Sequence, residues 1–232
     1  MNKVYAIIPA GGSGKRIGGN TPKQFMTFNG RELIAYTINI FNKCDKVDEI
    51  IVAVQPKYIE LIEKIKYNFG FDKLTKIVEG GKERQDSVFN ALISLKADND
   101  DFVLVHDAAR PLLPQNVLEH LLSSAKEKGN AVAAIKAKDT LVNGREIIVN
   151  YINRGEISYI QTPQIFKYST LLKAMQKARE ESFIGTDESM LVTRIGETVN
   201  LIEGSSLNFK VTTESDVELF HQIVGIREID FN

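Results

Sequence analysis

Near the start of the chain lies the stretch Ala6-Ile-Ile-Pro-Ala-Gly-Gly-Ser-Gly-Lys-Arg16, and Thr21-Pro-Lys-Gln-Phe25 follows shortly after it. An apolar strand runs into a glycine-rich turn that ends in two cations, Lys15 and Arg16. Residues 1–31 contain no aspartate or glutamate that could neutralise these cations. Backbone N–H groups in a glycine-rich turn, together with fixed positive charge, form a binding place for phosphate. The stretch therefore predicts a site for a nucleoside triphosphate, with chemistry at phosphorus.

This turn differs from the two common phosphate-binding sequences. In a P-loop, Arg16 would have to be Ser or Thr and Pro9 would have to be Gly. In a Rossmann fingerprint, Ile17 would have to be Gly or Ala. The simplest alternative is an ordinary strand-to-helix turn with solvated basic side chains. The Pro22-Lys-Gln24 extension and the missing acids favour the phosphate site.

The composition limits the classes of protein to which the chain can belong. Of its 232 residues, 43% are apolar and 25% are charged, as in a globular protein with a substantial core. The net charge of −1 argues against a nucleic-acid partner, and no apolar run is long enough for a membrane helix. Cys44 is the only cysteine and no signal-peptide pattern opens the chain, so we expect a cytoplasmic protein without internal disulfides. Cys44 is expected to lie at a helix end and not to act as a nucleophile.

Short apolar runs alternate with helical patterns over the first 135 residues. The expected strands are Val4–Pro9, Glu49–Val54, Thr75–Val78, Phe102–His106 and Ala131–Ile135. The expected helices are Glu32–Asn42, Lys57–Phe69, Gln85–Lys96 and Pro114–Lys128. Several strands lack polar alternation, which is typical of strands buried on both faces of a parallel sheet. The pattern predicts an α/β fold with a doubly wound, mostly parallel, Rossmann-like sheet that binds ligands at the carboxyl ends of its strands.

Residues 136–163 break this alternation. Asn143-Gly144 is a strong hairpin signal, and the possible strands Glu146–Ile152 and Ser158–Gln161 follow it. We expect an antiparallel β-arm at about residues 136–160 that projects from the sheet as a lid or as a dimer contact. No repeat, low-complexity tract or linker divides the chain, so residues 1–232 are expected to form a single domain with this arm.

Gly80-Gly81 and Ser87 form a second candidate ligand segment. The glycines follow an expected strand and precede an expected helix, so backbone there can approach a ligand closely. Ser87 could cap the helix or hydrogen-bond the edge of a base. An ordinary turn with a Ser or Asp cap, and no ligand, explains the same residues.

Polar side chains also follow the expected strand that ends at His106. Asp107 could hold Mg²⁺ or a ribose hydroxyl, because hard cations prefer oxygen ligands, and Arg110 could bind a phosphate. A mutual Asp107–Arg110 ion pair that closes the loop is the alternative. His106 is expected to be a packed strand-end residue, and three histidines without ligand spacing argue against a zinc site.

The last candidates lie near the C-terminus. Thr186-Asp187 is expected to cap a helix over Glu188–Ile195, and Thr213-x-x-Asp216 resembles a capping box for the final helix. Lys210 lies in a short β-like run after a polar loop, so its side chain could point into the site or into water.

These motifs occur in order over nearly the whole chain. They are Gly11-Gly-x-Gly-x-Arg16, Pro22-Lys-Gln24, Gly80-Gly-x-x-Arg84-x-x-Ser87, His106-Asp-Ala-Ala-Arg-Pro111, Lys138-Asp-Thr140, Arg154, Gln161-Thr-Pro-Gln164, Thr186-Asp-Glu188 and Lys210-Val-Thr212. The set resembles the family of 2-C-methyl-D-erythritol 4-phosphate cytidylyltransferases of the non-mevalonate isoprenoid pathway. The ribitol-5-phosphate cytidylyltransferases are similar, but they tend to carry Val at the position of Ala109 and Ser-Asp-Ala in place of Thr186-Asp-Glu188.

The resemblance implies that the phosphate of a sugar alcohol attacks the α-phosphorus of CTP and releases pyrophosphate, with Mg²⁺ or another divalent cation as cofactor. The implied catalytic residues are Arg16, Lys23 and Lys210. The implied nucleotide-binding residues are Pro9, Ala10, Gly11, Gly12, Ser13, Gly14, Lys15, Gly80, Gly81, Arg84, Ser87, Asp107 and Ala108. Asp107 is also the candidate metal ligand, although the triphosphate would hold most of the ion. Arg110, Thr140, Arg154, Thr162 and Thr186 would bind the sugar phosphate. In the family the arm reaches into the partner subunit, which implies a homodimer.

A regulatory nucleotide-binding domain of the same fold is the alternative from another class of protein. Such a domain would keep the glycine-rich turn but would not need Lys23, Arg154 and Lys210 together. Turnover of CTP distinguishes the two.

Overall fold

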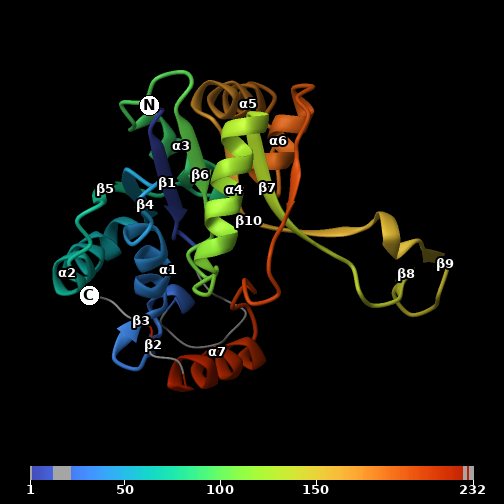
Figure 1. Ribbon diagram of the computed structural model, residues 1–232, viewed down its shortest axis with the longest axis horizontal. Helices are drawn as coiled ribbons and strands as arrows, with labels where there is room; N and C mark the ends of the chain where they lie inside the picture. The colour runs from blue at the N-terminus through green and yellow to red at the C-terminus, as the bar shows by residue number, and fades with distance from the viewer. Residues whose placement is uncertain (1, 13–21, 227–228, 230–232) are drawn as a thin grey trace.

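A seven-stranded sheet forms the centre of the computed structural model, which describes residues 2–12, 22–226 and 229. Its strands are β1 (Val4–Pro9), β4 (Glu49–Val54), β5 (Leu74–Glu79), β6 (Phe102–Val105), β7 (Asn130–Lys136), β10 (Ser158–Lys167) and β11 (Leu201–Glu203). They lie in the order β11-β7-β10-β6-β1-β4-β5, and only β10 runs antiparallel to its neighbours (Figure 1). The expected doubly wound, mostly parallel α/β sheet is confirmed.

Helices cover both faces of this sheet. They are α1 (Leu33–Asn42), α2 (Ile59–Phe69), α3 (Arg84–Ile93), α4 (Gln115–Lys128), α5 (Tyr168–Glu180) and α6 (Glu188–Arg194). Along β1, Ala6 and Ile8 pack in one cluster with α1, α2 and α4, whereas Tyr5 and Ile7 pack in another with α3, α5 and α6. Because both faces are buried, the strand is apolar at every position. The expected strands and helices of the first 135 residues are all present, with ends shifted by no more than three residues.

The second half of β10 was not expected from the sequence. The stretch Ser158–Gln161, expected as an arm strand, is the beginning of β10, which continues between β6 and β7. The register along β7 shifts between Ile160 and Gln164, and the Thr162–Pro163 peptide there is cis. The return strand of the arm therefore enters the sheet and carries Thr162 to the carboxyl end of β6.

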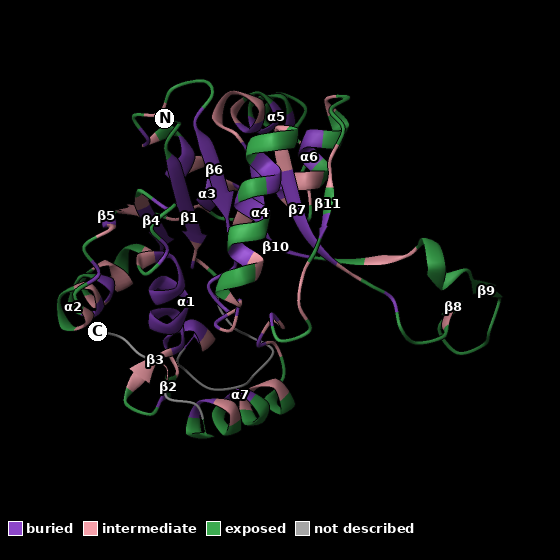
Figure 2. Cartoon of the chain, in the orientation of Figure 1, coloured by how far each residue is buried: buried purple, intermediate pink, exposed green. Residues whose placement is uncertain are grey.

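The arm itself is a small hairpin of β8 (Leu141–Asn143) and β9 (Asn150–Ile152) that projects away from the body (Figure 1). The strand expected over Glu146–Ile152 is shorter, because residues 144–149 form a loop between the two strands. Apolar side chains on the arm are exposed to solvent, among them Ile147 and Tyr151 at 77% and 68% (Figure 2).

A third apolar cluster attaches the C-terminal helix α7 (Glu214–Ile226) to the body. Phe220 packs edge-on against Phe28 and Tyr36, beside the two-stranded sheet of β2 (Thr27–Phe28) and β3 (Arg31–Glu32). The expected capping box is present, since Asp216 accepts from the Thr213 N–H and the Thr213 hydroxyl accepts from the Asp216 N–H. This packing places the segment before α7 next to Lys23, whose side chain contacts Val211.

Candidate active site

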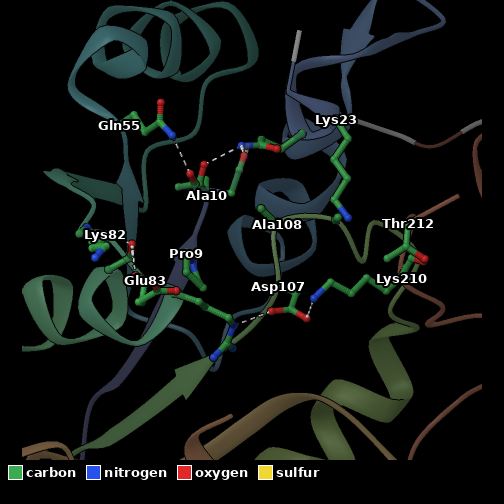
Figure 3. Close-up of a pocket in the computed structure, with 17 residues that line it drawn as sticks. Pro9, Ala10, Lys23, Gln55, Lys82, Glu83, Asp107, Ala108, Lys210 and Thr212 are labelled. Atoms are coloured by element: carbon green, nitrogen blue, oxygen red, sulfur yellow. Dashed lines mark hydrogen bonds and ion pairs between the residues drawn. The ribbon is translucent and has the colours of Figure 1, made fainter. Parts of the chain in front are cut away.

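A cavity of about 450 Å³ opens at the carboxyl ends of the parallel strands (Figure 3). It is lined by Pro9, Ala10, Gly11, Gly12, Lys23, Gln24, Gln55, Gly81, Lys82, Glu83, Arg84, Ser87, Asp107, Ala108, Ala109, Lys210 and Thr212. The sequence-predicted residues Ser13, Gly14, Lys15 and Arg16 lie outside the described residues. The end of β1, the start of α3, the loop after β6 and the segment before α7 thus meet at one place, as the motifs indicated.

Two glutamines, Gln24 of the Pro22-Lys-Gln24 motif and Gln55, which was not singled out from the sequence, hold the described part of the glycine-rich turn. Gln24 Nε2 donates to the carbonyls of Ala10 and Gly12 at 2.7 and 2.8 Å, and Gln55 Nε2 donates to the carbonyl of Gly11 at 2.9 Å. In a trans peptide the N–H points opposite to the C=O. Fixing the carbonyls of Ala10 and Gly11 therefore directs the N–H groups of Gly11 and Gly12 away from the glutamines. The available signal for Gln24 was its place directly after Lys23, whereas nothing local marked Gln55.

Ser87 acts as a bridge to the second glycine segment and not as a helix cap. Its hydroxyl accepts from the Gly81 N–H at 3.1 Å and lies 3.2 Å from the Glu83 carbonyl, to which it donates. Glu83 is the N-cap of α3, in a capping box with Asp86, so of the two roles considered for Ser87 the helix cap is wrong. A Cβ at Gly11 or Gly80 would lie 3.2 or 3.1 Å from the Ser87 hydroxyl oxygen, so a side chain at either position would have to displace that hydroxyl.

Asp107 lies at the centre of the charged groups. Arg84 Nε lies 3.0 Å from Oδ1, while Lys210 Nζ and Arg110 Nε lie 2.9 and 3.6 Å from Oδ2. Burial alone would raise the pKa of Asp107, but Arg84 and then Lys210 outweigh it and hold that pKa well below its usual range. The Asp107–Arg110 pair considered from the sequence is thus present, but it is the longest of three contacts.

Arg84 also binds a second carboxylate. Its two terminal nitrogens donate to both oxygens of Glu188, at 2.7 and 3.0 Å, and Glu188 is 1% exposed. Desolvation opposes the charge of Arg84, but Glu188 and Asp107 outweigh it and raise its pKa. Three guanidinium nitrogens therefore contact carboxylates, although Arg84 was predicted to bind the nucleotide.

Lys23 and Lys210 both line the cavity, and the Lys23 side chain contacts the backbone beside Lys210. Lys23 belongs to a short 3-10 helix (Lys23–Phe25) and donates from Nζ to the carbonyl of Val211 at 2.7 Å. The Val211 N–H donates to the carbonyl of Ala109. Lys210 itself lies in a loop and not in the β-like run expected from the sequence, because turns and the Asp216 cap hold this segment. Both amines line the cavity (Figure 3).

The residues predicted to bind the sugar phosphate lie at three places, and none of them lines the cavity. Arg110 and Thr162 lie beside Asp107, and the Thr162 hydroxyl accepts from the Asp107 N–H at 3.1 Å. Thr140 and Arg154 are exposed on the arm, where Arg154 donates to the carbonyl of Lys138. Thr186 is exposed just before Asp187, which caps α6 as expected by accepting from the Met190 N–H.

His106 and Cys44 are buried, as the sequence analysis expected of structural residues. His106 packs edge-on against Phe41, and its Nε2 lies 3.0 Å from the carbonyl of Arg110. Burial lowers the pKa of His106 to about 4 and raises that of the Cys44 thiol, so at neutral pH both groups are uncharged. Neither is placed to act as a base or nucleophile in the cavity.

His106 also predicts a pH dependence of stability. Its pKa is about 4 when folded and 6.5 ordinarily, so between these values unfolding takes up a proton. As the pH is lowered from 7 to 5, this group should therefore decrease the free energy of unfolding by about 2 kcal/mol. Urea titrations should show this slope in the wild type and a smaller one in His106→Gln. Equal slopes for the two proteins would contradict the assignment.

Over the part of the chain that the structure describes, two kinds of feature are absent. No three His, Cys, Asp or Glu side chains gather so that they could hold a metal ion by themselves. No described helix is both long and apolar enough to cross a membrane.

The mostly parallel sheet, the braced glycine turn and the amines facing one cavity define a nucleotidyltransferase. The chain belongs to the 2-C-methyl-D-erythritol 4-phosphate cytidylyltransferase (IspD) family, whose sequence model matches residues 4–225. This finding confirms the resemblance inferred from the motifs.

Individual relatives match along almost their whole length. The chain is 40% identical to the 2-C-methyl-D-erythritol 4-phosphate cytidylyltransferase of Clostridium perfringens over 227 residues, which is 97% of this chain and 100% of that protein. It is 39% identical to the enzyme of the same name from Bacillus cytotoxicus, covering 95% of this chain and 97% of that protein. The crystal structure of the Thermus thermophilus enzyme superposes with a TM-score of 0.80 at 30% identity, covering 97% of this chain and 100% of that one.

Proposed function

We propose that the protein transfers the cytidylyl group of CTP to 2-C-methyl-D-erythritol 4-phosphate, giving 4-diphosphocytidyl-2-C-methyl-D-erythritol and pyrophosphate for isoprenoid synthesis. The observation that carries the proposal is the pair of amines, Lys23 and Lys210, that line one cavity with the glycine-rich turn. The family and the names of the relatives support methylerythritol phosphate as acceptor, and not ribitol 5-phosphate.

The reaction needs charge compensation more than proton transfer. An oxygen of the acceptor phosphate forms a bond to the α-phosphorus, and the bond from that phosphorus to the bridging oxygen of pyrophosphate breaks. The attacking oxygen is already ionised at neutral pH, which agrees with the uncharged, buried state of His106. Lys23 and Lys210 would offset the repulsion between the two anions and stabilise the charge on five-coordinate phosphorus. Arg16 is proposed for the same role from its sequence position.

Mg²⁺ or another divalent cation is the proposed cofactor. Both oxygens of Asp107 already contact cations, since Oδ1 contacts Arg84 while Oδ2 contacts Lys210 and Arg110. Asp107 could therefore supply a single metal ligand at most. The triphosphate would have to supply most of the others. When bound, the ion would neutralise part of the triphosphate charge. This donor set fits a metal that arrives with its nucleotide.

We also propose a homodimer in the cytoplasm, in which the arm of each subunit completes the site of the other. The arm carries Thr140 and Arg154 away from the cavity of its own chain (Figure 1). Its exposed apolar side chains are the kind that a protein partner would cover. The proposal explains why residues of one predicted subsite lie apart.

The proposed function is tested by pyrophosphate release from CTP. Release should depend on 2-C-methyl-D-erythritol 4-phosphate, and ribitol 5-phosphate should support much less of it. Release without either acceptor, or none with any acceptor, would contradict the proposed transfer. Faster release with ribitol 5-phosphate would reassign the acceptor.

The cavity also predicts a preference for the base. The glycine segment around Gly81 and Ser87 presents fixed backbone groups beside the cavity, and cytosine and uracil differ in donors and acceptors. A mismatched base would leave buried polar groups unpaired, so kcat/KM for CTP should exceed that for UTP by about a hundredfold or more. Equal kcat/KM values for CTP and UTP would show that the segment does not recognise the base. Parallel assays with ATP and GTP control for a general lack of nucleotide discrimination.

A further inference from the structure

Glu188 is a buried carboxylate to which the proposed reaction assigns no role. It is the first residue of α6 and is 1% exposed, and both of its oxygens accept from the terminal nitrogens of Arg84. Taking a carboxylate out of water is costly unless it is paired and hydrogen-bonded. The bidentate contact meets that condition and joins α6 to the start of α3.

The contact with Glu188 fixes the direction in which Arg84 presents its third nitrogen. A guanidinium is planar and rigid, so holding its two terminal nitrogens determines where the Nε–H points. That N–H donates to Asp107 Oδ1 at 3.0 Å. Asp107 in turn contacts Lys210 Nζ through Oδ2 at 2.9 Å. A continuous series of contacts therefore leads from α6 to an amine in the cavity.

This cluster contains fewer carboxylates than cations. Two carboxylates, Asp107 and Glu188, serve three cations, Arg84, Arg110 and Lys210. Without the charge of Glu188, the three cations would share Asp107 alone. The terminal nitrogens of Arg84 would then compete for Oδ2, the oxygen that Lys210 now contacts. Loss of the Glu188 charge should thus displace the amine of Lys210, although Glu188 does not contact Lys210.

We propose that Glu188 is a positioning residue for Lys210, acting through Arg84 and Asp107. The proposal rests on the proposed function, in which Lys210 assists transfer at the α-phosphate. An ammonium has three donors, so Lys210 can keep its contact with Asp107 while it binds phosphate. Glu188 would set the place from which it does so.

The test uses Glu188→Gln, which keeps the size of the side chain and removes its charge. We expect kcat to fall about tenfold, with the KM values for CTP and for the acceptor within about threefold of wild type. In a Lys210→Met background the same substitution should cause no further loss, because the residue it positions is gone. The matched control is Glu181→Gln, which removes an exposed carboxylate paired with Arg194 and should leave kcat unchanged.

A second variant separates positioning from folding, because removing one partner of a buried ion pair can strongly destabilise a protein. In Arg84→Met/Glu188→Met apolar side chains replace the pair, so Tm should return close to wild type while kcat stays at least about tenfold low. Recovery of kcat together with Tm, full activity of a folded Glu188→Gln, or equal losses with and without Lys210 would each overturn the proposal. A wild-type protein that releases no acceptor-dependent pyrophosphate would instead overturn the proposed function.

Discussion

Lys23→Met should lower kcat about a hundredfold and weaken CTP binding far less. A group that acts mainly in the transition state commonly contributes roughly 3 kcal/mol, which corresponds to that factor in rate. Lys23 lines the cavity together with Lys210 and follows the acid-free, glycine-rich stretch. Arg16→Met is expected to behave in the same way, from its position in the sequence.

Steady-state kinetics with a separate measurement of CTP binding check this prediction. Lys64→Met is the matched control, because Lys64 is exposed on α2 and lies outside the cavity. Lys23 also donates to the carbonyl of Val211, so unfolding midpoints should be compared to show that the segment before α7 is intact. A Lys23→Met protein with near-normal kcat would show that the catalytic assignment is wrong. An equal loss in kcat and in affinity would assign Lys23 to binding in general.

The parallel part of the fold could be predicted because its strands are buried on both faces. Such strands are apolar at successive positions, as in Ala6-Ile-Ile, and that pattern is visible locally. The second half of β10 was missed because Thr162, Pro163 and Gln164 interrupt its apolar pattern. Thr162 contacts the Asp107 N–H, and Gln164 contacts the beginning of α6 and its cap, partners that no local pattern shows.

In the candidate site, too, local patterns could be predicted from the sequence, whereas contacts between distant residues could not. Asp107 was expected near the ligand because polar residues that follow a buried strand lie at its carboxyl end. Glu188 was read as the first residue of a capped helix and as part of the Thr186-Asp-Glu188 motif, with no role of its own, because a glutamate in the first turn of a helix is ordinary. Its partner Arg84 lies 104 residues away in the chain. Charge partners of this kind depend on the tertiary fold, so the sequence shows the candidates but not their pairing.

The arm makes the second large prediction, which concerns how two chains share a site. If Lys23 acts in one subunit while Arg154 comes from the other, Lys23→Met and Arg154→Ala homodimers should both be nearly inactive. In a mixed dimer, one site combines the intact Lys23 of one chain with the intact Arg154 of the other, and the second site lacks both. Random pairing makes half of the dimers mixed, so about a quarter of wild-type activity should return.

The measurement requires the two variants to be co-expressed, or mixed under conditions in which subunits exchange, with mixed dimers confirmed by mass. Arg145→Ala is the matched control, because Arg145 is also exposed on the arm and should not be needed in either site. Activity near zero in confirmed mixed dimers would mean that Arg154 serves its own subunit or that the arm is only a lid. A chain that stays monomeric with full activity would remove the shared site altogether. Recovery can arise only from residues of two chains meeting at one site, because neither variant carries both Lys23 and Arg154.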